Sequence, residues 1–156
     1  MISSSKISEE IVLHPSDHKK RSDWNNIFEF LERSTKGTRY NKVLDLGGGT
    51  GSLAYYFTKN DKNCRSTVVD VKNNLLEIAA GLHEGVETLN YDINKPLPFA
   101  DNSFDIACCL GTLHYLYIKD PIAVMREMGR VSRHFVFLDF FIKNSPYDFV
   151  QSRVYP

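Results

Sequence analysis

Glycines gather in one segment, Val43-Leu44-Asp45-Leu46-Gly47-Gly48-Gly49-Thr50-Gly51, between a short apolar run and a stretch that suits a helix. Glycine is needed where the backbone must approach a ligand with no Cβ in the way. The spacing Gly47-x-Gly49-x-Gly51 departs from the G-x-G-x-x-G pattern of dinucleotide sites, because Ser52 stands where a glycine or alanine is expected. The segment also lacks the Lys-Ser/Thr pair of a P-loop. It therefore predicts a ligand site that is poorly suited to a diphosphate.

Two acids follow the glycine segment at the ends of later predicted strands. Asp70 ends the second strand, 19 residues beyond Gly51, and Asp92 follows the third. In doubly wound sheets an acid at the tip of the second strand accepts hydrogen bonds from ribose hydroxyls. The glycines and Asp70 together predict a nucleoside ligand, and an adenosyl group without a diphosphate agrees with both.

The elements that must position these residues alternate along the chain. Apolar periodicity predicts strands over residues 42–46, 65–70, 86–91, 104–110 and 134–140. It predicts helices over residues 24–36, 51–59, 72–80 and about 121–131, and the prolines at 96 and 98 require a loop over 94–99. Repeated βα units imply a parallel sheet with helices on both faces, and ligands bind at the carboxyl edge of such sheets.

The order of these motifs resembles the class I S-adenosylmethionine-dependent methyltransferases. The resemblance is carried by VLDLGGGTG, the strand-end Asp70, Asp92 and LPFADNSFD, and it covers roughly residues 24–140. The wider stretch YDINKPLPFADNSFDIACCLGTLHYL resembles the small-molecule branch of that superfamily. The resemblance implies an α/β fold with a Rossmann-like doubly wound, mainly parallel sheet. It also implies S-adenosyl-L-methionine as the cofactor.

Roles in the adenosine half of the cofactor site follow from the resemblance alone. Asp70 would bind the ribose hydroxyls, and Val71 would pack on the adenine. Asp92 would accept a hydrogen bond from the adenine amino group, with the Ile93 backbone beside it.

The same resemblance assigns the methionine half of the site. The acid Asp45 would lie near the methionine moiety and contact it through the ammonium group of the methionine or through a water. The glycines would let the backbone pass beneath the methionyl and ribose portions, and backbone groups at the end of the fourth strand would meet the methionine amine. These residues are Asp45, Gly47, Gly48, Gly49, Gly51, Leu110 and Gly111.

Several of these residues have simpler interpretations. Asp45 could cap the following helix, Asp70 could be a solvated strand end, and Asp92 could form an Asx-turn. His114 could be a general base near neutral pH, or it could only line the pocket or cap the next helix. Asp105, inside the Ser-Phe-Asp strand, is expected to be structural.

Composition limits the partners. Lys plus Arg and Asp plus Glu number 19 each, so the formal net charge is zero, which argues against nucleic acid and anionic membranes. Three irregularly spaced cysteines indicate a reducing compartment rather than a disulfide framework, and no Cys/His cluster has zinc spacing. No apolar run approaches the roughly 20 residues of a membrane span, and the polar N-terminus does not suit a signal peptide. We expect a cytoplasmic protein with no bound metal.

The chain divides into a predicted tail over residues 1–22 and a domain over 23–156. Only 16 residues follow Phe140, too few for strands six and seven of a class I methyltransferase. The apolar run 135–142 would then be an exposed edge strand, which is a liability. Either the chain is a fragment of a longer methyltransferase, or a second copy or another partner covers this edge.

The function that these residues favour is methyl transfer to a small-molecule acceptor. One alternative is a methyltransferase-like binding or scaffold module without activity. A nicotinamide oxidoreductase is disfavoured by Ser52, and only the basic run His18–Arg21 favours an RNA methyltransferase. Neither the acceptor nor the methylated atom follows from the sequence.

Overall fold

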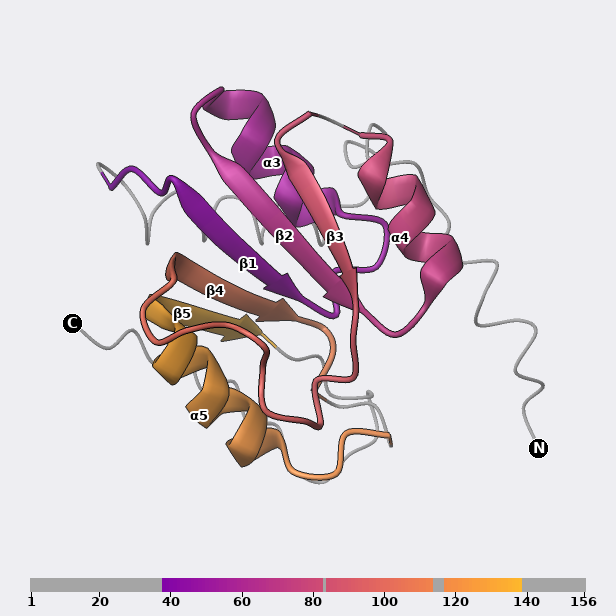
Figure 1. The fold of residues 1–156 in the computed structure, drawn as a ribbon, viewed down its shortest axis with the longest axis vertical. Helices are drawn as coiled ribbons and strands as arrows, with labels where there is room; N and C mark the ends of the chain where they lie inside the picture. The colour runs from indigo at the N-terminus through magenta and orange to yellow at the C-terminus, as the bar shows by residue number, and fades with distance from the viewer. Residues whose placement is uncertain (1–37, 83, 114–116, 139–156) are drawn as a thin grey trace. The chain divides into compact units, whose positions relative to one another are not determined.

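The computed structural model describes residues 38–82, 84–113 and 117–138 (Figure 1). The described elements belong to one compact unit that begins at Tyr40. The predicted tail over residues 1–22, the basic run within it and the predicted helix over 24–36 lie outside the described residues.

In the part of the chain that the structure describes, five strands form one sheet with the order β3-β2-β1-β4-β5, and every pairing between them is parallel (Figure 1). The strands are β1 (Lys42–Leu46), β2 (Arg65–Asp70), β3 (Val86–Asn90), β4 (Phe104–Leu110) and β5 (Ser132–Leu138). The helices of the described residues are α3 (Ser52–Asn60), α4 (Asn73–Ala80) and α5 (Pro121–Val131). The chain order reverses between β1 and β4, and in open parallel sheets such a switch point is where ligands bind.

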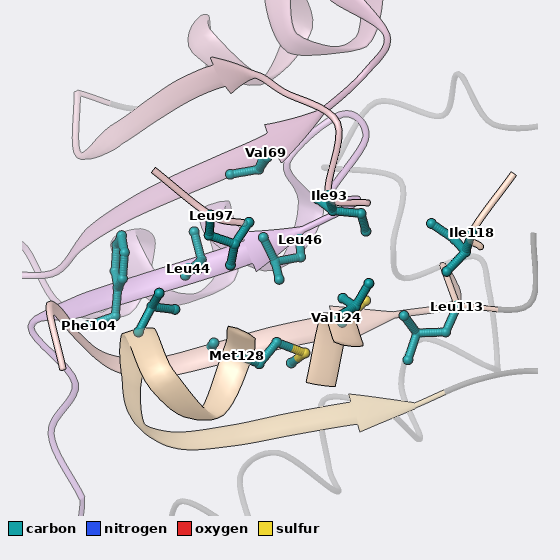
Figure 2. Close-up of a cluster of buried hydrophobic side chains, with 13 residues drawn as sticks. Leu44, Leu46, Val69, Ile93, Leu97, Phe104, Leu113, Ile118, Val124 and Met128 are labelled. Atoms are coloured by element: carbon teal, nitrogen blue, oxygen red, sulfur yellow. The ribbon is translucent and has the colours of Figure 1, made fainter. Parts of the chain in front are cut away.

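Helices cover both faces of the sheet, as the alternation of βα units predicts. On one face Ala54 of α3 and Leu76 and Ala79 of α4 pack against Val68 and Val86. On the other face α5 and the loop after β3 cover the alternate strand residues (Figure 2). That larger cluster is Leu44, Leu46, Val69, Ile93, Leu97, Phe104, Ala107, Cys109, Leu113, Ile118, Val124, Met128 and Val131.

The predicted strand bounds agree with the structure for β1, β2 and β4. β3 ends one residue earlier than predicted, and β5 spans 132–138 rather than 134–140. The shift of β5 arises because α5 leads into it without a loop. The Ser132 Oγ lies 2.6 Å from the Met128 carbonyl oxygen and 2.7 Å from that of His134, which satisfies the helix end at this junction. Within the described residues β5 is an edge strand, and residues 139–142 of the predicted apolar edge lie outside them.

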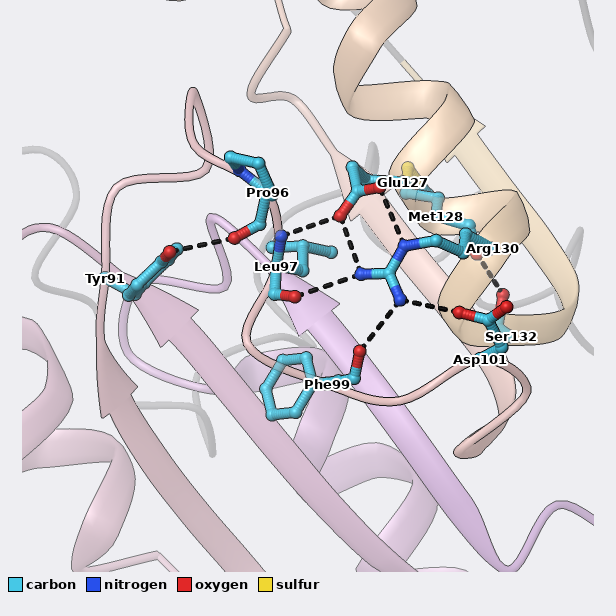
Figure 3. A network of polar contacts seen from close by, with 9 residues as sticks. All are labelled: Tyr91, Pro96, Leu97, Phe99, Asp101, Glu127, Met128, Arg130 and Ser132. Atoms are coloured by element: carbon cyan, nitrogen blue, oxygen red, sulfur yellow. Dashed lines mark hydrogen bonds and ion pairs between the residues drawn. The ribbon is translucent and has the colours of Figure 1, made fainter.

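The proline-containing loop after β3 is fastened to α5 by Arg130 (Figure 3). Its guanidinium donates to the carbonyl oxygens of Leu97 (3.0 Å) and Phe99 (2.9 Å) and pairs with Asp101. Glu127 accepts from Arg130 and from the Leu97 amide at 2.7 Å. The Arg130 hydrogen bond lowers the pKa of Glu127 from its usual value. This network holds a loop without regular structure in a defined position beside the sheet.

Candidate ligand site at the carboxyl edge of the sheet

The glycine segment turns sharply between β1 and α3. Gly47, Gly49 and Gly51 have φ values of 69°, 54° and 76°. A Cβ on Gly47 would lie 2.3 Å from the Thr112 Oγ1, so this glycine lets the loop approach the end of β4. A Cβ on Gly51 would lie 2.9 Å from the Cβ of Ala79 in α4. These positions therefore require glycine for their backbone conformation and for packing within the protein, and the predicted approach to a ligand stays a prediction.

Asp70 connects the tip of β2 to the glycine loop. Its Oδ2 accepts from the Gly49 amide at 3.1 Å, and its Oδ1 accepts from the Lys72 amide at 2.9 Å. The Gly47 amide in turn donates to the Val69 carbonyl oxygen at 2.7 Å. Each carboxylate oxygen of Asp70 keeps a further lone pair, because an ionised carboxylate offers about four acceptor positions. Asp70 is therefore more than a solvated strand end, since it fixes the loop and can still accept other hydrogen bonds.

Asp45 lies beneath the loop rather than open to solvent. It is 3% exposed, and its Oδ2 has no hydrogen-bond partner within the described part of the chain. A Cβ on Gly48 would lie 2.4 Å from that oxygen, so this glycine makes room for the acid. Burial, followed by the nearby charge of Asp70, raises the pKa of Asp45 to about 7, while a hydrogen bond from the Ala54 amide opposes the rise. The N-cap of α3 is Gly51 and no side-chain hydrogen bond caps it, so Asp45 is not the N-cap residue of this helix.

Asp92 follows β3 and forms the Asx-turn that was one of its two interpretations. Its Oδ1 accepts from the backbone amide of Asn94 at 3.0 Å and from the Asn94 side-chain amide at 2.8 Å. These two hydrogen bonds lower the pKa of Asp92 from its usual value. Its Oδ2 has no hydrogen bond from any described residue, so the turn leaves one oxygen for a ligand.

A partly open hollow lies between the glycine loop and the ends of β2 and β3. Its lining residues are Gly47, Val69, Asp70, Val71, Tyr91, Ile93 and Tyr117. Four of these, Gly47, Asp70, Val71 and Ile93, were predicted as ligand-binding residues from the sequence. Sequence reasoning missed Val69 and the two tyrosines. Tyr91 could have been found, because it stands next to Asp92 at a strand end, whereas no local pattern marks Tyr117.

The end of β4 closes the other side of the glycine loop. Leu110 ends the strand, Gly111 has φ 66°, and the Thr112 hydroxyl donates to the Gly47 carbonyl oxygen at 3.4 Å. The predicted residues Leu110 and Gly111 thus lie beside the loop, although they do not line the hollow. His114, the candidate general base, lies outside the described residues.

Other polar groups of the described structure have structural roles. The Asp105 carboxylate accepts from the amides of Asn41 and Lys42 at 2.8 and 3.0 Å, at the start of β1 and away from the glycine loop. Cys64, Cys108 and Cys109 are buried and free of disulfides, and burial raises the pKa of Cys64 and Cys108. Among the described residues no group of His, Cys, Asp and Glu could hold a metal ion, and no helix is long and apolar enough to cross a membrane.

This arrangement defines a class of protein: the chain belongs to a family of methyltransferase domains, whose model matches residues 43–134. It is 30% identical over 112 residues to the uncharacterized methyltransferase YcgJ of Bacillus subtilis, and the match covers 67% of this chain and 43% of YcgJ. It is 34% identical over 101 residues to the ubiquinone/menaquinone biosynthesis C-methyltransferase UbiE of Dinoroseobacter shibae, covering 58% of this chain and 40% of the relative. The chain thus spans less than half the length of these relatives.

The fold is also that of solved methyltransferases. A SAM-dependent methyltransferase from Aquifex aeolicus superposes with a TM-score of 0.61 at 24% identity, over 86% of this chain and 78% of that one. The predicted methyltransferase class is confirmed by the family model and the curated relative YcgJ, and the predicted Rossmann-like, mainly parallel sheet agrees with this superposition.

Proposed function

We propose that the hollow at the carboxyl edge of the sheet binds S-adenosyl-L-methionine and that the protein transfers its methyl group to a small-molecule acceptor. The observation that carries the proposal is Asp70, whose carboxylate is fixed by the Gly49 amide and borders a hollow with apolar walls. A fixed acceptor beside apolar surface suits a ligand with ribose hydroxyls and a flat base.

The residues present fit the adenosine half of this cofactor. Asp70 would accept from the ribose hydroxyls with its remaining lone pairs. Val71, which is 43% exposed, and the buried Ile93 would contact the base. The Oδ2 of Asp92 would accept from the adenine amino group, because Oδ1 is already taken by Asn94.

The glycine loop and the end of β4 would hold the methionine half. Asp45 would act from beneath the loop, where a ligand ammonium or a bridging water could compensate its buried charge. The full proposed set is Asp45, Gly47, Gly48, Gly49, Gly51, Asp70, Val71, Asp92, Ile93, Leu110 and Gly111.

When bound, the cofactor supplies an activated methyl group on a sulfonium sulfur. This chain's own residues then have to orient the ligand and keep it aligned with the acceptor, which is where most of the protein's contribution to such a displacement arises. The described residues include no side chain that we assign as a general base.

A small-molecule acceptor is supported by the relative UbiE, which is named for ubiquinone and menaquinone biosynthesis. The formal net charge of zero is a second support, because nucleic-acid binding surfaces are basic.

We also propose that β5, an edge strand of the described sheet, is covered by a second copy or by another partner. A concentration series in sedimentation tests this, and a monomer at all concentrations contradicts pairing between copies.

The cofactor site is tested by calorimetric titration with S-adenosylhomocysteine, with NAD as the control ligand. We expect binding of the former only, lost in Asp70→Ala and kept in Glu87→Ala, which removes an exposed carboxylate from β3. Binding of NAD, or equal affinities for the two variants, would contradict the proposed site. Methylation is then assayed with quinol, phenol and amine acceptors and with total RNA, and methylation of RNA alone would overturn the small-molecule assignment.

A further inference from the structure

Asn94 connects two segments that are far apart in the sequence. Its Nδ2 donates to the Asp92 Oδ1 at 2.8 Å and to the Tyr117 carbonyl oxygen at 3.1 Å. Its Oδ1 accepts from the Lys119 amide at 2.8 Å. One side-chain amide therefore uses both its donor group and its acceptor to join the turn after β3 to residues 117–119, ahead of α5.

Both joined segments contribute to the hollow. Ile93 lines it from the turn after β3, and Tyr117 lines it from the segment before α5. Tyr117 is 44% exposed, so this aromatic residue lies at the hollow and is not buried in the core. Aromatic rings at such places bind nucleobases by stacking, which contributes regardless of the base because every base has a π-face.

The backbone before α5 needs this support. Residues 117–120 are not in a helix or strand, and the first regular element after them is α5, which begins at Pro121. A loop segment keeps one conformation only when hydrogen bonds or packing fix it. The two Asn94 hydrogen bonds, to Tyr117 and to Lys119, supply that restraint on both sides of Ile118, which is buried in the core.

We propose that Asn94 is a positioning residue that sets Tyr117 as an aromatic wall for the nucleobase. The inference rests on the proposed cofactor site and deepens it, because it assigns a binding role to Tyr117 and a supporting role to Asn94. Asn94 does not itself line the hollow; it acts on Tyr117 through the backbone of residues 117–119, and separately it holds the Asp92 carboxylate.

The test is a double-mutant cycle read by calorimetric titration with S-adenosylhomocysteine. Tyr117→Ala should weaken binding roughly tenfold or more, the range expected for loss of one base–aromatic stack. Tyr117→Phe should keep wild-type affinity, since the ring is retained. Asn94→Ala should weaken binding by a larger factor in the wild type than in the Tyr117→Ala background, because coupled residues do not act additively. The loss that remains in that background reports the hydrogen bond from Asn94 to Asp92, which also belongs to the proposed site.

The matched control is Asn63→Ala, which removes an exposed asparagine from the turn before β2, at the opposite end of the sheet. Thermal unfolding of each variant shows whether weaker binding comes with loss of the folded structure. Tyr117→Ala is expected to fold, because Tyr117 is partly exposed and not part of the buried core. Additive losses, or wild-type affinity of Asn94→Ala, would overturn the inference while leaving the cofactor site in place. Failure of the wild type to bind the ligand would overturn both.

Discussion

Replacement of Asp45 by asparagine should change how stability depends on pH. The carboxyl is 3% exposed, and its Oδ2 has no partner among the described residues, so ionisation in the folded state is costly. Asparagine has nearly the same shape and no ionisable proton. It removes the charge while it keeps the space under Gly48 filled.

The direction follows from the pKa of Asp45, which burial and Asp70 raise from 3.8 to about 7. Between these two values the folded protein holds a proton that the unfolded chain has lost, so the free energy of unfolding falls as pH rises. Below the lower value both states are protonated, and above the upper value both are ionised, so the contribution is constant there. A rise of about three pKa units corresponds to about 4 kcal/mol lost over this range.

The assay is urea denaturation of the wild type and of Asp45→Asn at intervals from pH 4.5 to 8.5. Relative to the wild type, the variant should become steadily more stable up to about pH 7, with little further change above it. Glu87→Gln, which neutralises an exposed carboxylate on β3, should run parallel to the wild type. Parallel profiles for Asp45→Asn and the wild type would refute the reasoning, because they would mean that the buried carboxyl ionises without penalty.

Two further predictions concern the loop and its support. Gly51→Ala should destabilise the protein by about 1–2 kcal/mol in urea denaturation, because φ is 76° and the new Cβ would lie 2.9 Å from the Cβ of Ala79. Gly129→Ala is the matched control, because Gly129 lies within α5 and its new Cβ would lie 3.5 Å from the nearest Phe135 atom. This variant should stabilise the protein by about 0.5–1 kcal/mol. Equal losses of stability in the two variants would contradict the role of the positive φ at Gly51. Arg130→Met should speed hydrogen exchange of the Leu97 amide, because this amide donates to Glu127 and Arg130 holds the Glu127 carboxylate. Arg126→Met, which replaces an exposed arginine one turn earlier, should leave this exchange rate unchanged. Unchanged exchange in Arg130→Met would show that the loop holds its position without the guanidinium.

The strands and helices were largely predictable because their signals are local. Apolar runs placed β1, β2 and β4, and glycine directly follows the first and the last of these. Asp120 before Pro121 marked the start of α5, where its Oδ1 accepts from the amides of Ile122 and Ala123. The end of α5 was less predictable, because the direct entry into β5 depends on the Ser132 hydroxyl and on pairing with β4. Such tertiary contacts leave no periodic pattern in the sequence.

The candidate site divides in the same way. The glycines and Asp70 stand at strand ends, and the topology brings strand ends together, so their meeting followed from the order of elements. Tyr117 and Asn94 meet only because a long loop returns across the sheet from β3, and hydrogen bonds from one side chain fix that return. The burial of Asp45 was also hidden, because a strand-end acid can equally be exposed or covered by the following loop.

That burial is informative about function for a physical reason. A neutral side chain of the same shape beneath Gly48 would fill the space without the cost of a charge, so the fold itself gains little from the carboxyl of Asp45. Asp105 and Asp120, which hold the start of β1 and of α5, differ from Asp45 because each accepts two backbone hydrogen bonds from those segments. Groups with strongly shifted pKa values and few internal partners concentrate at functional sites, where a ligand supplies the missing interaction. Relative to the wild type, Asp45→Asn should therefore have a higher free energy of unfolding above pH 7 and a lower affinity for S-adenosylhomocysteine.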